Sequence, residues 1–465
     1  MPGARGSSRQ RYTERSENDA KREKGPAMGQ KVQGTEDLFG GYMRAWQRMQ
    51  DVARELFGAY GFDMIETPAI EQVDTFVHGI GESTDVVRKE MFRVFSGALL
   101  PDILERGSES HLKPRQRMAM RPEGTAGVVR AAVENNFVPQ GGAPVKLWYA
   151  EAMFRGERPQ KGRLRQFHQV GVEWLGASDP AADAECIIML MQFFERLGFS
   201  RESLRLTINS MGDAACRPAY REKVRAFIMD HADEMCEDCL ERAQINPLRS
   251  FDCKNDHCRE VMSAAPLAPD NLCDECAEHY AAVKRYLDAA GVPYVEDPTL
   301  VRGLDYYTRT VFEVEVEGAG VGAIGGGGRY DGLVELEGGK PTPGLGFAVG
   351  FERIALALAA QGVELGGEKP GCVYVACTPG EAERSAAFEA CLALRAAGVR
   401  TEADYQGRSL KSQFKQADKL GATLCVVIGA DEVAAGAVTL RDMASHEQVQ
   451  VPVAGLADAV RARLA

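Results

Sequence analysis

The sequence predicts an α+β fold that carries a helical insertion and ends in a separate α/β domain. Three observations support this prediction. Along the first three quarters of the chain, the expected strands and helices come in groups rather than in strict alternation, which is typical of α+β folds. Residues 214–286 have a helical pattern and are rich in cysteine and charge, and from residue 372 onward strands and helices alternate.

Length and composition indicate a globular protein with several domains. The 465 residues are enough for two or three hydrophobic cores, and 45% hydrophobic and 26% charged residues are ordinary values. No apolar run approaches membrane-spanning length and no signal peptide is visible, so we expect a cytoplasmic protein without a membrane partner. The net charge of −12 argues against a general coat for polyanions, although a local basic patch can still bind nucleic acid.

The expected elements begin after a polar tail. Residues 1–27 are almost free of large apolar side chains, which predicts disorder. Helical spacing of Met43, Trp46 and Met49 predicts a helix that ends at Gly61, and residues 64–76 are expected to form a strand interrupted by Pro68. The later elements are a strand, charged turn and strand over 145–175, a helix over 183–199, a strand over 204–212, strands over 301–316 and 322–334, and a helix over 350–361.

Composition shifts predict the domain boundaries. The stretch GVELGGEKPG is rich in glycine and separates the α+β part from the α/β part. The expected divisions are a tail at 1–27, a catalytic domain at 28–213 that resumes at 287–361, an insertion at 214–286, a linker at 362–371 and a C-terminal domain at 372–465.

The charged turn FRGERPQKGRLRQFHQ contains five cations and one acid, Glu157, between Arg155 and Arg165. On antiparallel strands, side-chain alternation would place Arg163, Arg165 and Phe167 on one face and His168 on the other. Guanidinium groups beside an aromatic ring suit the phosphates and base of a nucleotide. On charge alone, a solvated hairpin is the commoner situation.

Two further stretches leave alternatives open. The run GAGVGAIGGGGRYDGL lacks a phosphate-loop signature and a βαβ setting, so its glycines indicate the close approach of a ligand or of a neighbouring strand. In RPEGTAGVVRA, Thr125 caps an apolar helix, or Glu123 and Thr125 hold an ammonium group.

Taken together, these stretches resemble the class II aminoacyl-tRNA synthetases, and within them the histidyl-tRNA synthetases of the bacterial type. The strand around Pro68 resembles motif 1, which forms the dimer interface in that class, and FRGERPQKGRLRQFHQ resembles the ATP-binding motif 2. GLGFAVGFERI resembles motif 3, RGLDYYTRTVFE is similar to the histidine-specific motif, and GGGGRYDGL to its companion. The resemblance extends from about residue 28 to the C-terminus.

The resemblance implies a fold and a reaction. The fold is the class II antiparallel sheet flanked by helices, with a C-terminal anticodon-binding domain. The reaction activates L-histidine with ATP and transfers it to histidine tRNA, with Mg²⁺ expected beside ATP and no organic cofactor. A homodimer is expected, and the insertion is expected to lie over the acceptor arm of the tRNA.

The resemblance also implies site residues. For ATP, Arg155 contacts the α-phosphate, Arg163 and Arg353 hold the outer phosphates, Phe167 stacks on adenine and Glu157 lies near its amino edge. The residues implied in histidine binding are Glu123, Gly124, Thr125, Arg155, Gln169, Glu173, Arg302, Tyr306 and Tyr307.

Individual roles within the histidine set follow the chemistry of the amino acid. Glu123, Thr125 and Gln169 hold the α-ammonium group, and Glu173 lies on the same strand face as Gln169 because it follows four residues later. Glu173 and Tyr307 pair with the two imidazole nitrogens, and Tyr306 lines the pocket. Arg302 bridges the histidine carboxylate and the α-phosphate, so Arg302 and Arg155 are the expected catalytic residues.

Six of the twelve cysteines lie within residues 236–276 of the insertion, with His257 and His279 nearby. Two C-x-x-C pairs are typical of zinc sites, but the pairs are far apart and the resemblance does not imply zinc. The sequence therefore assigns no metal ligand and leaves open whether these cysteines bind zinc: Cys236, Cys239, Cys253, Cys258, Cys273 and Cys276.

A basic stripe is expected in the C-terminal domain. Arg408, Lys411, Lys415 and Lys419 are spaced at helical intervals. A solvated helix face would account for them, but the resemblance to an anticodon-binding domain makes contact with the RNA backbone the expected role.

Three rival functions remain to be separated from this one. A regulatory histidine sensor derived from a synthetase typically lacks the anticodon domain and has degraded catalytic motifs, whereas this chain keeps both. A class II synthetase for another amino acid would need a pocket different from RGLDYY. A pure RNA-binding module would leave the ATP-type arginines without a purpose.

Overall fold

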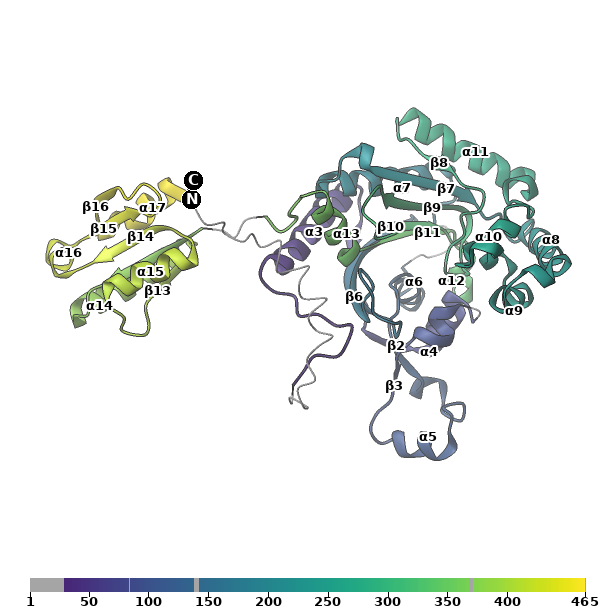
Figure 1. Cartoon of the computed structure of the whole chain (residues 1–465), viewed down its shortest axis with the longest axis horizontal. Coiled ribbons are helices and arrows are strands. Elements are labelled where there is room, and N and C mark those ends of the chain that lie inside the picture. Colours follow the sequence, from purple (N-terminus) through teal and green to yellow (C-terminus); the bar gives the residue numbers. More distant parts are fainter. Residues whose placement is uncertain (1–28, 83, 138–141, 368–370, 465) are drawn as a thin grey trace. The chain divides into compact units, whose positions relative to one another are not determined.

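The computed structural model describes residues 29–82, 84–137, 142–367 and 371–464 (Figure 1). The chain forms two compact units, one up to residue 367 and one from residue 368 onward. The tail predicted at residues 1–27 lies outside the described residues. Among the helices described, none is long and apolar enough to cross a membrane.

The first unit is built on a large mixed sheet, which confirms the α+β prediction. Its inner strands pair antiparallel, whereas the short strands at the two edges, β1 and β8, pair parallel to β5 and β7. In spatial order the strands are β1 (Asp63–Met64), β5 (Val145–Phe154), β6 (Gln166–Leu175), β11 (Gly344–Gly350), β10 (Gly325–Arg329), β9 (Thr308–Val316), β7 (Leu204–Ser210) and β8 (Val295–Glu296).

Helices cover both faces of this sheet (Figure 1). Because side chains alternate along a strand, Trp148 packs into the core on one face, whereas Leu147 and Tyr149 point to the other. The helices on the Trp148 face are α3 (Gly40–Ala59), α7 (Pro180–Leu197), α11 (Asp274–Ala289) and α13 (Phe351–Ala360). The opposite face holds α6 (Thr125–Glu134), with α4 (Val73–Ile80) and α12 (Leu333–Leu336) beside it.

Residues 64–76 do not form the predicted strand. Two short strands, β1 and β2 (Ile70–Gln72), lie on either side of Pro68, and helix α4 begins at Val73. Proline cannot donate to a ladder, and the buried residues Val73, Phe76 and Ile80 are spaced as in a helix. β2 belongs to a small sheet with β4 (Met118–Met120) and β3 (Arg93–Val94), near which lie η2 (Val86–Glu90), α5 (Leu100–Arg106) and η3 (Pro114–Gln116).

The insertion is helical, as the sequence predicts. Its last helix, α11, buries Tyr280, Val283 and Leu287 in the core of the large sheet and so joins the insertion to the main body. Before the insertion comes η4 (Arg201–Ser203), and its own elements are α8 (Arg217–Asp230), η5 (Ala232–Glu234), α9 (Glu237–Ile245), η6 (Pro247–Asp252), α10 (Asp256–Met262) and η7 (Pro269–Asn271).

The second unit is an α/β domain with a five-stranded mixed sheet. Its strands in spatial order are β13 (Thr401–Ala403), β12 (Cys372–Cys377), β14 (Ala422–Ile428), β15 (Ala437–Asp442) and β16 (Gln448–Pro452). Its helices are α14 (Glu381–Ala396), α15 (Leu410–Leu420), α16 (Ala430–Ala435), η8 (Val453–Gly455) and α17 (Leu456–Leu464).

Candidate active site

A cluster of buried polar side chains lies where α6 faces the large sheet, and we call this cluster the pocket. Val170 and Val172 of β6 pack into the core on the opposite face, so Gln169 and Glu173 point toward α6. This arrangement confirms that the two residues share one face of the strand. The Oε1 atom of Gln169 is buried and has no hydrogen-bond partner among the residues described, which leaves an acceptor available to a ligand.

Glu173 is the central carboxyl group of this pocket. It is 1% exposed, and it accepts hydrogen bonds from the Thr125 hydroxyl at 2.7 Å and from the Tyr330 hydroxyl. Burial raises the pKa of Glu173 to about 8, and its hydrogen bonds offset only part of that shift. The carboxyl group therefore titrates near neutral pH.

Glu123 fixes the start of α6 and closes another side of the pocket. Its two oxygens accept the backbone N–H groups of Thr125 at 2.9 Å and Ala126 at 2.8 Å. Thr125 is the first residue of the helix and makes no capping bond, so its predicted role as the cap is wrong. Thr125 instead turns its hydroxyl to Glu173, because Glu123 already satisfies the first N–H groups of the helix.

Gly124 is required by the packing of a tyrosine. A Cβ atom at this position would lie 2.3 Å from the ring of Tyr149, and one at Gly171 would lie 2.3 Å from the Tyr149 hydroxyl. The two glycines therefore let the fully buried phenol of Tyr149 lie beside Glu123 and Glu173. Burial raises the pKa of Tyr149 most, and the charges of the two glutamates raise it further.

The stretch RGLDYY forms a loop, although the sequence predicts a strand from residue 301. Strand β9 begins only at Thr308, because the N–H of Asp305 bonds to the carbonyl of Ile80 in α4 at 3.0 Å. Arg309 has a φ of 47°, which turns the chain into the sheet. The loop buries Tyr306 and Tyr307 with ring centroids 4.7 Å apart, and the Tyr306 hydroxyl donates to Glu123 at 3.3 Å.

Arg302 lies at the edge of the same pocket. Its guanidinium group pairs with Glu313 of β9 and lies 5.6 Å from the ring centroid of Tyr307. A Cβ atom at Gly326 would lie 2.8 Å from Nη1 of Arg302. The glycine strand β10 thus admits an arginine above its backbone.

The other glycines of β10 admit neighbouring strands. A Cβ atom at Gly327 would meet the carbonyl oxygen of Gly346 at 2.0 Å, and one at Gly328 would meet the carbonyl oxygen of Thr310 at 2.5 Å. At the end of this strand, the buried Arg329 pairs with Asp183 of α7, with Nε and Oδ1 3.1 Å apart. Of the alternatives left open by the sequence, close strand packing therefore accounts for these glycines.

Three arginines, Arg155, Arg163 and Arg353, lie near enough to one another for their charges to interact. Arg155 donates to the carbonyl of Pro122 at 2.9 Å and lies 5.2 Å from the ring centroid of Phe167. Arg353 donates to the carbonyl of Ala323 at 2.8 Å, and burial together with the nearby charge of Arg163 lowers its pKa. The arginines repel one another, so an anion bound here would relieve that repulsion.

The charged turn departs from the alternation expected of its arginines. β5 ends at Phe154 and β6 begins at Gln166, so Arg163 and Arg165 lie outside the strand. Arg163 forms a turn with Gln160 and lies 3.5 Å from Glu157. The two strands stop pairing well before the turn, because Pro159 and Gly162 interrupt the ladder.

The two residues that follow Gln166 in β6 occupy the predicted faces. Phe167 packs beside Tyr149 and Met153 on the α6 face. His168 lies on the other face, with its Nδ1 atom 2.9 Å from Glu352 and its ring 5.0 Å from that of Trp46.

Tyr330 and Tyr149 are pocket residues that the sequence does not single out. Tyr330 follows the glycine run closely, is 1% exposed and donates to Glu173. A tyrosine at the end of a fully buried strand needs a polar partner, and this requirement is the sequence feature that could have marked Tyr330 as a pocket residue. Tyr149 stands among apolar strand residues and gave no such signal.

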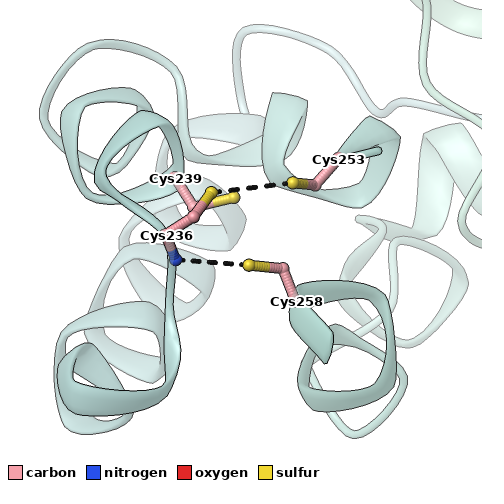
Figure 2. Close-up of side chains that lie close together, drawn as sticks. All are labelled: Cys236, Cys239, Cys253 and Cys258. Atoms are coloured by element: carbon pink, nitrogen blue, oxygen red, sulfur yellow. Dashed lines mark hydrogen bonds between the residues drawn. The ribbon is translucent and has the colours of Figure 1, made fainter. Parts of the chain in front are cut away.

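The cysteines of the insertion form two groups rather than one. Cys236, Cys239, Cys253 and Cys258 lie together (Figure 2), whereas Cys273 and Cys276 lie with Cys216 and Asp213. Among the described residues, neither His257 nor His279 joins these groups.

In the second unit, the basic stripe is shorter than predicted. Lys411, Lys415 and Lys419 are exposed on α15, opposite the buried Gln413 and Ala417. Arg408 precedes the helix, where its backbone N–H bonds to Asp404 at 2.6 Å and its side chain bonds to Gln406. Arg408 is therefore not part of the helical stripe, since the helix begins at Leu410.

Comparison with known proteins identifies the family. Residues 111–354, more than half of the chain, match the family model for histidyl-tRNA synthetase. The chain belongs to the histidyl-tRNA synthetase family. Residues 372–463 match the anticodon binding domain model.

Individual relatives support this membership over nearly the whole length. The chain is 45% identical over 429 residues to the histidine–tRNA ligase of Moorella thermoacetica, covering 92% of this chain and 97% of the relative. It is 46% identical over 431 residues to that of Desulforudis audaxviator, with the same coverage. The crystal structure of apo S. aureus histidyl-tRNA synthetase is similar, with a TM-score of 0.75 at 33% identity, covering 93% of this chain and 99% of that one.

Proposed function

We propose that this chain ligates L-histidine to its tRNA in an ATP-dependent reaction that passes through histidyl-adenylate. The histidine carboxylate attacks the α-phosphorus of ATP, the bond to the bridging oxygen breaks and pyrophosphate leaves. The 3′-hydroxyl of the terminal adenosine then attacks the carbonyl carbon of the adenylate, and AMP leaves. Neither step needs a covalent nucleophile from the enzyme, so catalysis consists of alignment and charge stabilisation.

The buried pocket around Glu173 carries this proposal. A neutral imidazole has one donor and one acceptor nitrogen, and Glu173 and Tyr307 supply a buried carboxyl and a buried phenol to pair with them. An apolar amino acid of similar size would offer neither group a hydrogen-bond partner, so the site would discriminate against it. Because Glu173 has a pKa of about 8, it can share a proton with the imidazole near neutral pH.

The other end of histidine meets the polar groups next to α6. Glu123, Gly124, Thr125 and Gln169 surround the α-ammonium group in this proposal. The support is that the Glu123 carboxyl is buried and that Gln169 keeps an unpaired buried oxygen. Tyr306 lines the same wall.

The arginines hold ATP and the reacting centre. Arg155 contacts the α-phosphate, Arg163 and Arg353 contact the outer phosphates, and Arg302 bridges the histidine carboxylate and the α-phosphate. The guanidinium groups of Arg155, Arg353 and Arg302 are aligned in advance by carbonyl and carboxylate partners, so little reorganisation is needed as charge develops.

Adenine and magnesium complete the ATP site. Adenine stacks on Phe167, with Glu157 near its amino edge. Mg²⁺ accompanies the triphosphate, because it prefers phosphate oxygens, water and one or two carboxylates. Glu157 and Glu313, whose charges both act on Arg353, offer such carboxylates.

We further propose a cytoplasmic homodimer that binds tRNA through the second unit. Met64 of β1 and Ile70 of β2 are 50% and 46% exposed, which suits apolar residues that a second copy covers. Lys411, Lys415 and Lys419 offer one exposed cationic face to the anticodon arm, and Arg408 lies beside it.

Histidine-dependent exchange between ATP and pyrophosphate tests the proposal. The native chain should catalyse exchange, and Arg302→Ala should reduce it by about 10²–10³-fold, as expected when a group that stabilises developing charge is lost. Arg205→Ala, which removes an exposed arginine from β7 of the same sheet, is the matched control and should leave exchange unchanged. Near-normal exchange in Arg302→Ala would refute its catalytic role, and no exchange in the native chain would favour a histidine sensor.

A further inference from the structure

Four cysteines of the insertion converge on one point (Figure 2). The ligand atoms of Cys236, Cys239, Cys253 and Cys258 all lie within 4.8 Å of one another, and the sulfur atoms of Cys236 and Cys253 are 3.8 Å apart. A tetrahedral zinc site with Zn–S bonds of about 2.3 Å holds its sulfur atoms about 3.8 Å apart. The spacing of the thiols therefore matches the edge of a zinc–sulfur tetrahedron.

The secondary structure around these cysteines is arranged to bring them together. Cys236 is the N-cap residue of α9 and Cys239 lies in its first turn, so both sulfur atoms sit at the N-terminal end of the helix. Cys253 ends η6, and Cys258 lies in α10. The N–H of Cys236 donates to the sulfur of Cys258 at 3.2 Å, an interaction that stabilises a thiolate more than a thiol.

A disulfide and an apolar cluster of thiols both fit these four cysteines less well than a metal site does. A disulfide needs sulfur atoms about 2.05 Å apart, far below the separation of Cys236 and Cys253. Cysteines can also serve as small apolar side chains. However, apolar packing alone does not require four ligand atoms to lie within 4.8 Å of one another.

A second cluster repeats the same design. Cys273 is the N-cap residue of α11 and Cys276 lies in the first turn of that helix. Their ligand atoms lie within 4.8 Å of those of Cys216 and Asp213, and the sulfur atoms of Cys216 and Cys276 are 3.9 Å apart. A carboxylate is an accepted fourth ligand beside three thiolates.

The surroundings of the second cluster support this view independently. Arg309 donates to Oδ2 of Asp213 at 3.1 Å, as outer partners of metal ligands commonly do, and leaves Oδ1 directed at the thiols. Gly212 has a φ of 67°, and a Cβ atom there would lie 2.7 Å from the sulfur of Cys216. The chain thus makes room for that thiol at a position which favours glycine.

We propose that the insertion binds two structural Zn²⁺ ions, one held by Cys236, Cys239, Cys253 and Cys258 and the other by Asp213, Cys216, Cys273 and Cys276. Both sites supply four protein ligands, so neither leaves a position for substrate or water. The first ion joins α9 to α10. The second joins the segment after β7 to α11, which packs on α7 of the main body.

Zinc analysis of the full chain, purified under reducing conditions without chelator, tests this proposal. We expect about two equivalents of zinc per chain, released in full when a mercurial reagent blocks the thiols. Less than about half an equivalent would overturn the proposal, and about one equivalent would overturn one of the two sites, which the substitutions below identify. Iron in place of zinc would overturn the assignment of the metal.

Single substitutions assign each ion to its cluster. Cys258→Ser and Cys276→Ser should each lose about one equivalent, whereas Cys377→Ser, a cysteine of the second unit, should keep about two. Asp213→Asn retains the shape of the side chain but weakens the ligand, so it should speed release from one site only. If Cys258→Ser and Cys276→Ser retained as much zinc as the control, the clusters would not be the binding sites.

Discussion

The polar pocket around Glu173 and the cysteine clusters are both buried groups of ionisable side chains, but they satisfy those groups in different ways. In the pocket, Glu123 and Glu173 accept hydrogen bonds from backbone N–H groups, a threonine and tyrosines of the same chain. In the insertion, the thiols mainly face one another. A pocket whose carboxyl groups are already paired can form before its ligand binds, whereas we expect a cluster of thiols to need an ion to hold it together.

Zinc removal should produce the largest difference between the two regions. Because structural zinc contributes about 10–16 kcal/mol to the folding of small modules, stripping it should unfold the insertion and leave the polar pocket formed. Limited trypsin digestion before and after treatment with a mercurial reagent measures this. We expect cleavage within residues 214–286 to become at least about 100-fold faster.

The second unit provides the internal control for that digestion, since neither cysteine cluster includes any of its described residues. Cleavage within residues 372–464 should keep its rate. Unchanged cleavage of the insertion after the metal has left would show that the clusters need no ion.

A substitution in the pocket tests whether its hydrogen bonds serve histidine. Glu173→Gln keeps the shape but removes the ionisable proton that Glu173 is proposed to share with the imidazole, so histidine should bind about 10- to 100-fold more weakly. ATP binding should change by less than about two-fold, because in the proposed site the arginines bind the phosphates. Isothermal titration with each ligand measures both constants, Glu315→Gln on the exposed side of β9 is the control, and equal losses for both ligands would contradict the assignment.

The pKa of Glu173 predicts how stability changes with pH. The folded chain keeps a proton on Glu173 up to about pH 8, whereas the unfolded chain loses it near the ordinary value of 4.5. The free energy of unfolding should therefore fall as pH rises between these values, by at most about 1.4 kcal/mol per pH unit from this group.

Denaturant unfolding of the native chain and of Glu173→Gln across this window isolates that contribution. Glu337, whose pKa burial also raises to about 8, titrates in both chains and cancels in the difference. The native chain should lose stability relative to the variant as pH rises. A difference that stays constant with pH would mean that Glu173 ionises as an ordinary carboxyl group.

The smallest effects are expected at the exposed lysines of α15, which belong to the second unit. Replacing Lys411, Lys415 and Lys419 with alanine should raise the KM for tRNA a few-fold and leave ATP–pyrophosphate exchange unchanged. The dependence of tRNA binding on salt should weaken by about one unit of log–log slope for each lysine that contacts a phosphate. Arg463→Ala on α17 is the control, and an unchanged salt dependence in the triple variant would place the RNA elsewhere.

The pocket was more accessible to sequence analysis than the insertion was. Gln169 and Glu173 lie on one regular strand, so alternation alone placed both on the same face. Residues 302–307 form a loop where the sequence predicts a strand. The contact between Asp305 and Ile80, which keeps this loop out of the ladder, joins residues that are distant in sequence and leaves no local pattern. The start of α4 was likewise missed, since a short helix directly after a strand offers little periodicity.

The cysteine clusters show a stronger limit of pattern analysis. Two C-x-x-C pairs invite the assumption of one shared site, yet each pair heads a different helix. Cys216 and Asp213 complete the second cluster because the segment after β7 delivers them beside α11, and no local pattern marks them as ligands.

The glycine strand β10 has a consequence for how the sheet assembles. Without side chains on residues 325–328, nothing within the strand distinguishes its correct alignment from a slip along β9 and β11. A slip by one residue would carry Arg329 to the opposite face, away from Asp183, so this ion pair fixes the register of β10. A substitution of Asp183 in α7 would therefore shift the backbone beneath Arg302. It would impair the proposed reaction although Asp183 does not contact the substrates.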